Sequence, residues 1–139
     1  MKQRSYWHHN MNPRVYLAGP IFQQTDAVCN DWRAVFKVVT GYEWLDPMKR
    51  DFRGKEDKAY AEIVEGDKED IDGCNIMVAK VDPVSAGTSM EVLWAWLNET
   101  PVIAIVNGRI SPWVRYHATH IAKSEEEALE ILRGLTPSI

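Results

Sequence analysis

This sequence lacks an excess of basic residues, and its mildly acidic balance argues against one class of partner. The chain has 16 Lys and Arg against 20 Asp and Glu, a formal net charge of −4. Proteins that coat nucleic acids present a basic face to the phosphates. We therefore expect no nucleic acid among the partners of this chain.

Cysteines, long apolar runs and signature motifs are also scarce. Cys29 and Cys74 are the only two cysteines and form no CxxC pair, so we expect a reduced, cytoplasmic protein. No apolar run approaches the roughly 20 residues of a membrane helix, and the N-terminus lacks the apolar segment of a signal peptide. No membrane is therefore expected as a partner.

The motifs of cofactor, phosphoryl-transfer and zinc chemistry are missing as well. The chain contains no GxGxxG, no GxxxxGK[ST] and no HExxH motif, so we expect no cofactor. His117 and His120 have the spacing of some metal pairs, but no third ligand is evident. The sequence therefore predicts no metal site.

Strand and helix patterns alternate along the chain. Its 139 residues suffice for one domain. We assign residues 12–139 to this domain and residues 1–11 to an N-terminal tail. Predicted strands span residues 14–18, 42–45, 75–81 and 101–106. Predicted helices span residues 25–40, 58–73, 88–99 and 124–132, with a polar loop at 48–57 and a short helix or turn at 111–120.

The predicted strands are apolar on both faces and are joined by helices. This pattern indicates an α/β fold with a parallel sheet covered on both sides. Ligands of such sheets bind at the carboxyl ends of the strands. Four loops should therefore meet at one edge, at residues 19–22, 46–57, 82–88 and 107–111.

Glu91 stands one turn into the helix predicted at residues 88–99, within an otherwise apolar segment. Thr88 and Glu91 have the spacing of a capping box, in which the glutamate would only close the helix start. A catalytic carboxylate is the alternative, because the helix start lies at the ligand-binding edge and Gly87 leaves room for a substrate. A helix N-terminus also favours the ionised carboxylate that a nucleophile needs.

A second group of acids precedes the strand predicted at residues 75–81. Most of these carboxylates should belong to a solvated helix face, and an inward one needs a reason, because the helix dipole disfavours it. Cleavage of a glycosidic bond would supply that reason, since it uses one carboxylate at the anomeric carbon and a second group to move a proton. The group comprises Glu65, Asp67, Glu69, Asp70 and Asp72.

Several segments, in their order and spacing, resemble the nucleoside 2-deoxyribosyltransferase family. They are VYLAGPIF from Val15, LDP from Leu45, the acid at Asp67, GTSMEVLWA from Gly87 and PVIAIV from Pro101. The resemblance covers about residues 15–120. It implies a flavodoxin-like (Rossmann-like) three-layer sandwich of about five parallel strands, and homo-oligomers in which a neighbouring subunit completes the site.

The resemblance also implies roles for individual residues. Glu91 takes the place of the nucleophile, Asp67 that of the acid–base partner, and Tyr16 that of the residue that orients the nucleophile. Further residues are expected to bind substrate, with the loop that bears Asp46, Arg50 and Arg53 covering the base. The other expected substrate-binding residues are Gly19, Pro20, Phe22, Ser85, Gly87 and Ser111.

Two serines depart from the pattern of enzymes that act on free nucleosides. Ser85 stands where those enzymes carry an acid, and Ser85 and Ser111 are similar to serines of the related 2′-deoxynucleoside 5′-monophosphate N-hydrolases. Hydroxyl groups suit a phosphate, which an acid would repel. Ser111 also precedes Pro112 as a helix N-cap would, and the two roles are compatible. Pro20 stands where those hydrolases have a serine.

Together these observations predict an enzyme that cleaves the N-glycosidic bond of 2′-deoxynucleosides or their 5′-monophosphates. A covalent glycosyl-Glu91 intermediate would pass its deoxyribosyl group to a second base. Two alternatives stay open: a 5′-monophosphate N-hydrolase with water as the acceptor, and a nucleotide-sensing module in which Glu91 only caps a helix. Trp94, Trp96 and Trp113 supply apolar bulk for the expected subunit interface.

Overall fold

The computed structural model describes residues 12–136, so the tail predicted at residues 1–11 lies outside the described residues. The division into tail and domain stays a prediction. Strands in the described part are β1 (Arg14–Ala18), β2 (Glu43–Leu45), β3 (Ile76–Lys80), β4 (Val102–Ile105) and β5 (His120–Ala122). Helices there are α1 (Asp26–Lys37), the 3-10 helix η1 (Pro47–Arg50), α2 (Glu56–Gly73), α3 (Ala86–Leu97), α4 (Pro112–His117) and α5 (Glu125–Leu135).

All strands of the sheet are parallel, in the order β2-β1-β3-β4-β5. This is the flavodoxin-like order, whose ligand crevice lies where the chain reverses direction along the sheet, between β1 and β3. Tyr16 of β1 is paired there with Met77 of β3 and, on the other side, with Leu45 of β2. The predicted fold class and the strand number are confirmed.

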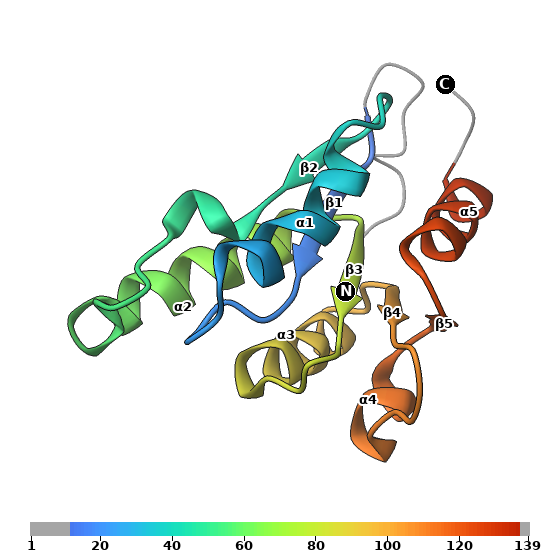
Figure 1. Cartoon of the computed structure of the whole chain (residues 1–139). Coiled ribbons are helices and arrows are strands. Elements are labelled where there is room, and N and C mark those ends of the chain that lie inside the picture. The colour runs from blue at the N-terminus through green and yellow to red at the C-terminus, as the bar shows by residue number, and fades with distance from the viewer. Residues whose placement is uncertain (1–11, 137–139) are drawn as a thin grey trace.

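The two faces of the sheet are covered by different helices (Figure 1). Side chains alternate along a strand, so Val15 and Leu17 pack with α1 and α5, whereas Tyr16 and Ala18 pack with α2 and α3. The result is the predicted three-layer sandwich. Because Tyr16 is on the α2–α3 face, a polar group in β1 meets the acids of those two helices.

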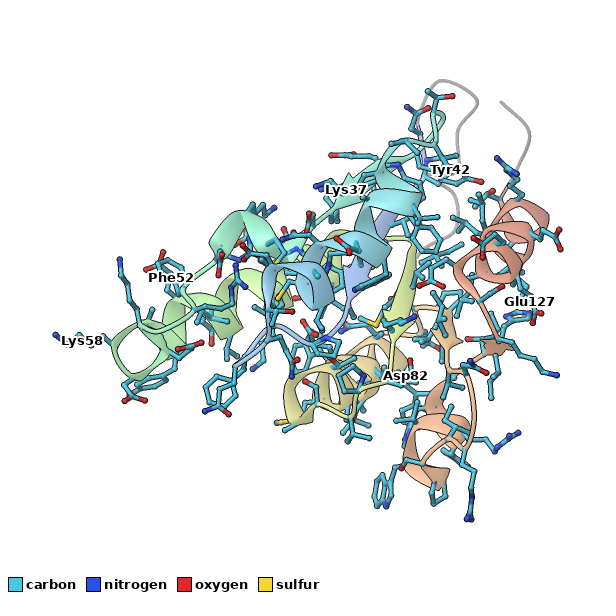
Figure 2. All side chains as sticks on the ribbon, in the orientation of Figure 1. Lys37, Tyr42, Phe52, Lys58, Asp82 and Glu127 are labelled. Carbon is cyan, nitrogen blue, oxygen red and sulfur yellow. The ribbon has the colours of Figure 1, made fainter. Side chains whose placement is uncertain are left out.

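The first half of α2 extends beyond the sheet (Figure 1). Ile71, near the end of this 18-residue helix, is its one fully buried residue. Figure 2 places Phe52 and Lys58 at the outer end of this extension. No helix within residues 12–136 is long and apolar enough to cross a membrane.

Several element boundaries differ from the sequence prediction. Helix α1 ends at Lys37, three residues early, because the amide of Val39 bonds to the carbonyl of Phe36 and closes the last turn. Gly41, with φ +94°, belongs to the following turn. The predicted polar loop begins as η1, for which Asp46 is the N-cap. Strand β5 was missed, because three residues carry too short an apolar pattern.

Candidate active site

Tyr16 is fully buried in β1, and its hydroxyl donates a hydrogen bond to Oε2 of Glu91. Burial, followed by the negative charges of Glu91 and Asp67, raises the pKa of Tyr16 well above its usual value. The phenol therefore keeps its proton and stays a hydrogen-bond donor. It fixes one oxygen of the Glu91 carboxylate.

Glu91 lies in the second turn of α3, not at the helix start. The N-cap of α3 is Ser85, whose Oγ accepts a hydrogen bond from the amide of Thr88 at 3.3 Å. The capping-box interpretation, in which Thr88 caps the helix and Glu91 closes it, is therefore wrong. The carboxylate of Glu91 is bonded instead to Tyr16 of the sheet.

Asp67 is the acid of the second group that interacts with Tyr16 and Glu91. Its Oδ1 accepts a bond from Nη2 of Arg50 at 2.9 Å. The same Arg50 nitrogen bonds to Asp70 at 2.7 Å, and Asp72 accepts a bond from the indole of Trp94 at 2.8 Å. The acids of α2 thus have separate partners, and Asp67 is the one directed to the Tyr16–Glu91 pair.

The carboxyl groups of Glu91 and Asp67 both hold their protons more tightly than usual. Burial, followed by the charge of Asp67, raises the pKa of Glu91 to about 8, against the opposing effects of Tyr16, Arg33 and Arg50. Burial likewise raises the pKa of Asp67, although its bond to Arg50 acts in the opposite direction. Two interacting carboxylates of this kind titrate as a pair that shares one proton near neutral pH. Such pairs are found at catalytic sites.

Arg33 of α1 is a buried cation that sequence reasoning missed. Its side chain is 1% exposed, and it donates to the backbone carbonyls of Leu17, Gly19 and Cys29. Burial lowers its pKa, yet its guanidinium holds the chain where it leaves β1. A signal was present, because Arg33 is four residues after the buried Cys29 and so lies on the apolar face of its helix.

The loop after β1 is built around this cation. A Cβ on Gly19 would lie 2.6 Å from the ring of Trp32, so the loop passes close only because this residue is glycine. Pro20 is buried and Phe22 is 62% exposed. Phe22 and Arg53 help to line a hollow of about 480 Å³, which Tyr16, Asp67 and Glu91 do not line.

The loop after β2 brings its charged residues to different places. Asp46 accepts bonds from the amide of Met48 at 2.9 Å and from Lys37 at 2.7 Å. Arg50 is bonded to Asp67 and Asp70. Arg53 is bonded to Asp26 and Asp51, beside the hollow. Thus Arg50 lies with Glu91 and Asp67, Arg53 lies with Phe22, and Asp46 is bonded to α1.

Ser85 and Ser111 end the loops that follow the neighbouring strands β3 and β4, and Gly87 lies in the first turn of α3. These loops are tied together, because the amide of Asn107 donates to Asp82 at 3.2 Å. Gly87 is exposed, and a Cβ there would meet only Ser85 Oγ, at 3.9 Å. Ser111 is the N-cap of α4 and accepts from the amide of Trp113 at 3.2 Å, as the sequence predicted.

Histidines and acids of the described part of the chain form no group of three or more metal-ligating side chains. His117 lies among aromatic rings, with its centroid 5.0 Å from that of Trp96 and 4.9 Å from that of Tyr116. His120 belongs to β5. The pair is thus divided between a helix end and the sheet.

Solved structures of similar fold cover most of this chain. A conserved protein from Enterococcus faecalis has a TM-score of 0.72 at 18% identity, covering 89% of this chain and 99% of that one. A 2-deoxyribosyltransferase from Bacillus psychrosaccharolyticus has a TM-score of 0.71 at 14% identity, covering 91% and 99%. A CMP N-glycosidase from Clostridium botulinum has a TM-score of 0.55 at 19% identity, covering 86% and 98%.

Sequence comparison adds the family to this fold. No curated protein sequence matches the chain. The model of the nucleoside 2-deoxyribosyltransferase family, whose members act on nucleosides, matches residues 15–125. This range contains the buried Tyr16–Glu91 bond, Asp67 and the loops around them. The chain belongs to the nucleoside 2-deoxyribosyltransferase family.

Proposed function

We propose that this chain is an enzyme that breaks the N-glycosidic bond of a 2′-deoxynucleoside or its 5′-monophosphate. The observation that carries the proposal is the bond from the buried Tyr16 hydroxyl to Glu91, whose carboxylate interacts electrostatically with that of Asp67. Two such carboxylates are the groups that glycosidic cleavage uses. Family membership supports a deoxyribosyltransferase-like or N-glycosidase-like activity.

In the first step, Glu91 is the nucleophile. Its carboxylate oxygen forms a bond to the anomeric carbon while the carbon–nitrogen bond breaks and its electron pair leaves with the base. Asp67 gives its proton to the departing nitrogen. Because Tyr16 holds Oε2 of Glu91, the other carboxylate oxygen is the one available for attack, and attack is directed rather than random.

In the second step, an acceptor takes the deoxyribosyl group. A second base attacks the anomeric carbon, its proton goes to Asp67, and the bond to Glu91 breaks. The enzyme thereby returns to its starting state, in which Glu91 and Asp67 share one proton. Transfer between bases is the outcome that we favour, because it is the activity after which the family is named.

Hydrolysis of a nucleoside 5′-monophosphate is a second candidate, supported by Ser85. Its Oγ accepts the Thr88 amide bond at 3.3 Å, which leaves the hydroxyl proton to be donated. A phosphate accepts such bonds, each worth roughly 1.5–3 kcal/mol when charge-assisted. Ser111 offers a second hydroxyl in the loop after the neighbouring strand.

The nucleotide-sensing alternative has lost its structural premise. It required Glu91 to be only a helix cap, and Ser85 is the cap of α3. A binding module also has no need of a buried carboxylate pair that shares a proton, which is costly in stability. We therefore retain the enzyme.

One assay tests the proposed reaction and its acceptor. The protein is incubated with matched deoxynucleosides and their 5′-monophosphates, with and without a second base, and free base and exchanged product are quantified. We expect base release or exchange in the wild type and its loss, by 10³-fold or more, in Glu91→Gln, as for a removed catalytic group. Activity in Glu91→Gln within tenfold of the wild type would refute the nucleophile.

The same assay tests the phosphate candidate. If Ser85 and Ser111 bind phosphate, the monophosphate should be preferred by about a hundredfold or more in kcat/KM. Ser85→Asp should abolish this preference, because the new charge repels the phosphate. Ser138→Asp, at the far end of the chain sequence, is the control. A wild type that prefers the nucleoside would rule the phosphate site out.

We also propose that the chain forms a homo-oligomer through an apolar face on α3 and α4. Trp94 belongs less to this face than predicted, because it packs against the core and donates to Asp72 at 2.8 Å. Trp96 and Trp113 are 45% and 73% exposed. The other exposed apolar residues of the face are Met90, Leu93, Leu97 and Tyr116.

A further inference from the structure

The cation beside the proposed proton donor is shared between two carboxylates. A single nitrogen, Nη2 of Arg50, donates to Asp67 Oδ1 at 2.9 Å and to Asp70 Oδ2 at 2.7 Å. The side chains are 17%, 18% and 14% exposed for Arg50, Asp67 and Asp70. In such a partly buried environment, charge-assisted hydrogen bonds are strong and hold the side chains in a fixed orientation.

Gly66 provides the place in which Arg50 lies. A Cβ at Gly66 would be 2.5 Å from Nε and 2.6 Å from Cδ of Arg50, so the guanidinium passes directly over the helix backbone. Glycine within a helix costs about 1 kcal/mol relative to alanine. We therefore ask what the close approach of Arg50 to Gly66 contributes.

The two carboxylates bonded to Arg50 differ in their other cation partners. Asp70 has a second cation, Lys49, at 3.0 Å, whereas Asp67 has Arg50 as its cation partner. On its other side, Asp67 faces Tyr16 and Glu91. The titratable and charged groups that act on Asp67 or its partners come from five elements: η1 (Lys49, Arg50), β1 (Tyr16), α1 (Arg33), α3 (Glu91) and α2 itself (Asp70).

We propose that Arg50 is the positioning residue of the proton donor: lying over Gly66, it orients the Asp67 carboxylate, and Asp70 limits how much of its positive charge Asp67 receives. This inference rests on the proposed function, in which Asp67 protonates the departing base. An undivided Arg50 would lower the pKa of Asp67 further and favour the ionised form, which has no proton to give. Without Arg50, the carboxylate would lose its fixed orientation.

The two neighbours of Asp67 therefore act in opposite directions on its proton. Arg50 lowers the pKa of Asp67 and the charge of Asp70 raises it. Arg50→Met should raise the pKa of Asp67 by about 1 unit or more, as expected for loss of a contacting cation. Asp70→Asn should lower this pKa, because it removes a negative charge and leaves Arg50 to Asp67 alone.

Titration by NMR of the aspartate carboxyl carbons tests this without any activity assay. The signal of Asp67 is identified by its loss in Asp67→Asn and is followed in the wild type, Arg50→Met, Asp70→Asn and Gly66→Ala. Gly66→Ala should resemble Arg50→Met, because the new methyl group displaces the guanidinium without changing any charge. The matched controls are Gly134→Ala, a helical glycine of α5 with open space around it, and Arg133→Met, an exposed arginine of the same helix.

The pH dependence of kcat/KM then connects the titration to the reaction. We expect the whole bell-shaped profile to move to higher pH in Arg50→Met and Gly66→Ala, because Arg50 lowers the pKa of both Asp67 and Glu91. It should move to lower pH in Asp70→Asn and stay unchanged in both controls. If Glu91→Gln releases base within tenfold of the wild-type rate, the proposed function fails, whatever the titration gives. If Glu91→Gln is inactive but Asp67 titrates alike in all four proteins, or its shifts leave the profile in place, Arg50 has no such role and this inference alone is overturned.

Discussion

Among single residues, Glu91 combines a cost in stability with a proposed catalytic role. A glutamate ionises in the unfolded chain near its ordinary pKa of 4.5, whereas burial raises the pKa of Glu91 in the folded protein to about 8. Between these values the unfolded chain has released the proton and the folded protein still holds it. The free energy of unfolding must therefore fall as the pH rises from about 4.5 to about 8.

Glu91→Gln should consequently stabilise the protein while it abolishes activity. Glutamine keeps an oxygen that accepts the Tyr16 hydrogen bond but has no proton to lose. We expect its free energy of unfolding near pH 8 to exceed that of the wild type by on the order of 2 kcal/mol, and this gain should vanish in acid. Urea unfolding at a series of pH values measures it.

Glu130→Gln, at an exposed glutamate of α5, is the matched control for that stability series. A Glu91→Gln variant less stable than the wild type near neutral pH would contradict the buried carboxylate. That result would return Glu91 to a structural role.

The pair of Glu91 and Asp67 predicts a bell-shaped pH dependence of kcat/KM. Release of the base needs Glu91 ionised and one proton on Asp67. The pair loses its last proton as the pH rises through about 8 and gains a second one in acid. Activity should therefore decline on both sides. Initial rates at low substrate concentration, measured from about pH 5 to about pH 9.5, give the profile.

Asp67→Asn serves as the comparison for this profile. Its slower reaction should rise with pH to a plateau, since only ionisation of Glu91 remains. The inflection, which reports the pKa of Glu91, should lie below the wild-type pKa of about 8, because the charge of Asp67 no longer raises it. A profile of unchanged shape in Asp67→Asn would show that Asp67 is not the proton donor.

Residues that match a motif were easier to predict than residues defined by their surroundings. Tyr16, Asp67 and Glu91 were named from the order and spacing of short segments, and they interact in the structure. Arg33 was missed, because its partners are backbone carbonyls that come together only in the folded chain. The contact of Arg50 with Gly66 was hidden for the same reason.

At the scale of elements, α1 is attached to β1 by the buried Arg33. Its guanidinium bonds to two carbonyls at the end of the strand and one in its own helix. Asp46 beyond β2 lies 3.6 Å from it and 2.7 Å from the exposed Lys37. Arg33 makes the longer contact with Asp46 but is buried, whereas Lys37 makes the shorter contact and is exposed. Burial, rather than distance, therefore decides which of the two cations contributes more to stability.

Arg33→Met should therefore cost far more stability than Lys37→Met. The first variant removes three buried hydrogen bonds from a charged donor, and we expect a loss of about 3–5 kcal/mol in the free energy of unfolding. The second removes an exposed ion pair and should cost about 0–1 kcal/mol. Chemical denaturation of both variants measures the difference. Equal losses would mean that Arg33 does not hold α1 on β1.

Element types were predicted more reliably than element ends. Apolar runs separated by amphipathic segments identified β1 to β4 and the helices between them, because both patterns reflect burial in a covered parallel sheet. The start of α3 was placed two residues late, since Ser85 and Thr88 are both suitable caps and only the fold selects Ser85. The edge strand β5 pairs with β4 alone and needs little apolar sequence.

At the scale of the whole molecule, α3 has two different faces. One carries Val92 and Ala95 into the core beside Tyr16, and the other presents apolar side chains to solvent. The mean hydropathy of a helix cannot tell these faces apart, which is why the sequence indicated an interface without locating it. The ring of Trp96 lies 6.3 Å from that of Tyr116, so the exposed faces of α3 and α4 meet at these two side chains.

We expect this surface to be covered by a second copy of the chain. Contiguous exposed apolar patches of this kind are rare on monomers and mark association sites. Light scattering at micromolar concentration should give at least twice the monomer mass of 15.9 kDa.

Trp113→Asp, at a residue 73% exposed, should weaken the assembly by tenfold or more in Kd, since an aromatic anchor is replaced by a charge. Val38→Asp, at a residue 78% exposed beyond α1, is the control. Activity should fall with the assembly if a neighbouring subunit completes the site, and a fully active wild-type monomer would contradict both the interface and the shared site.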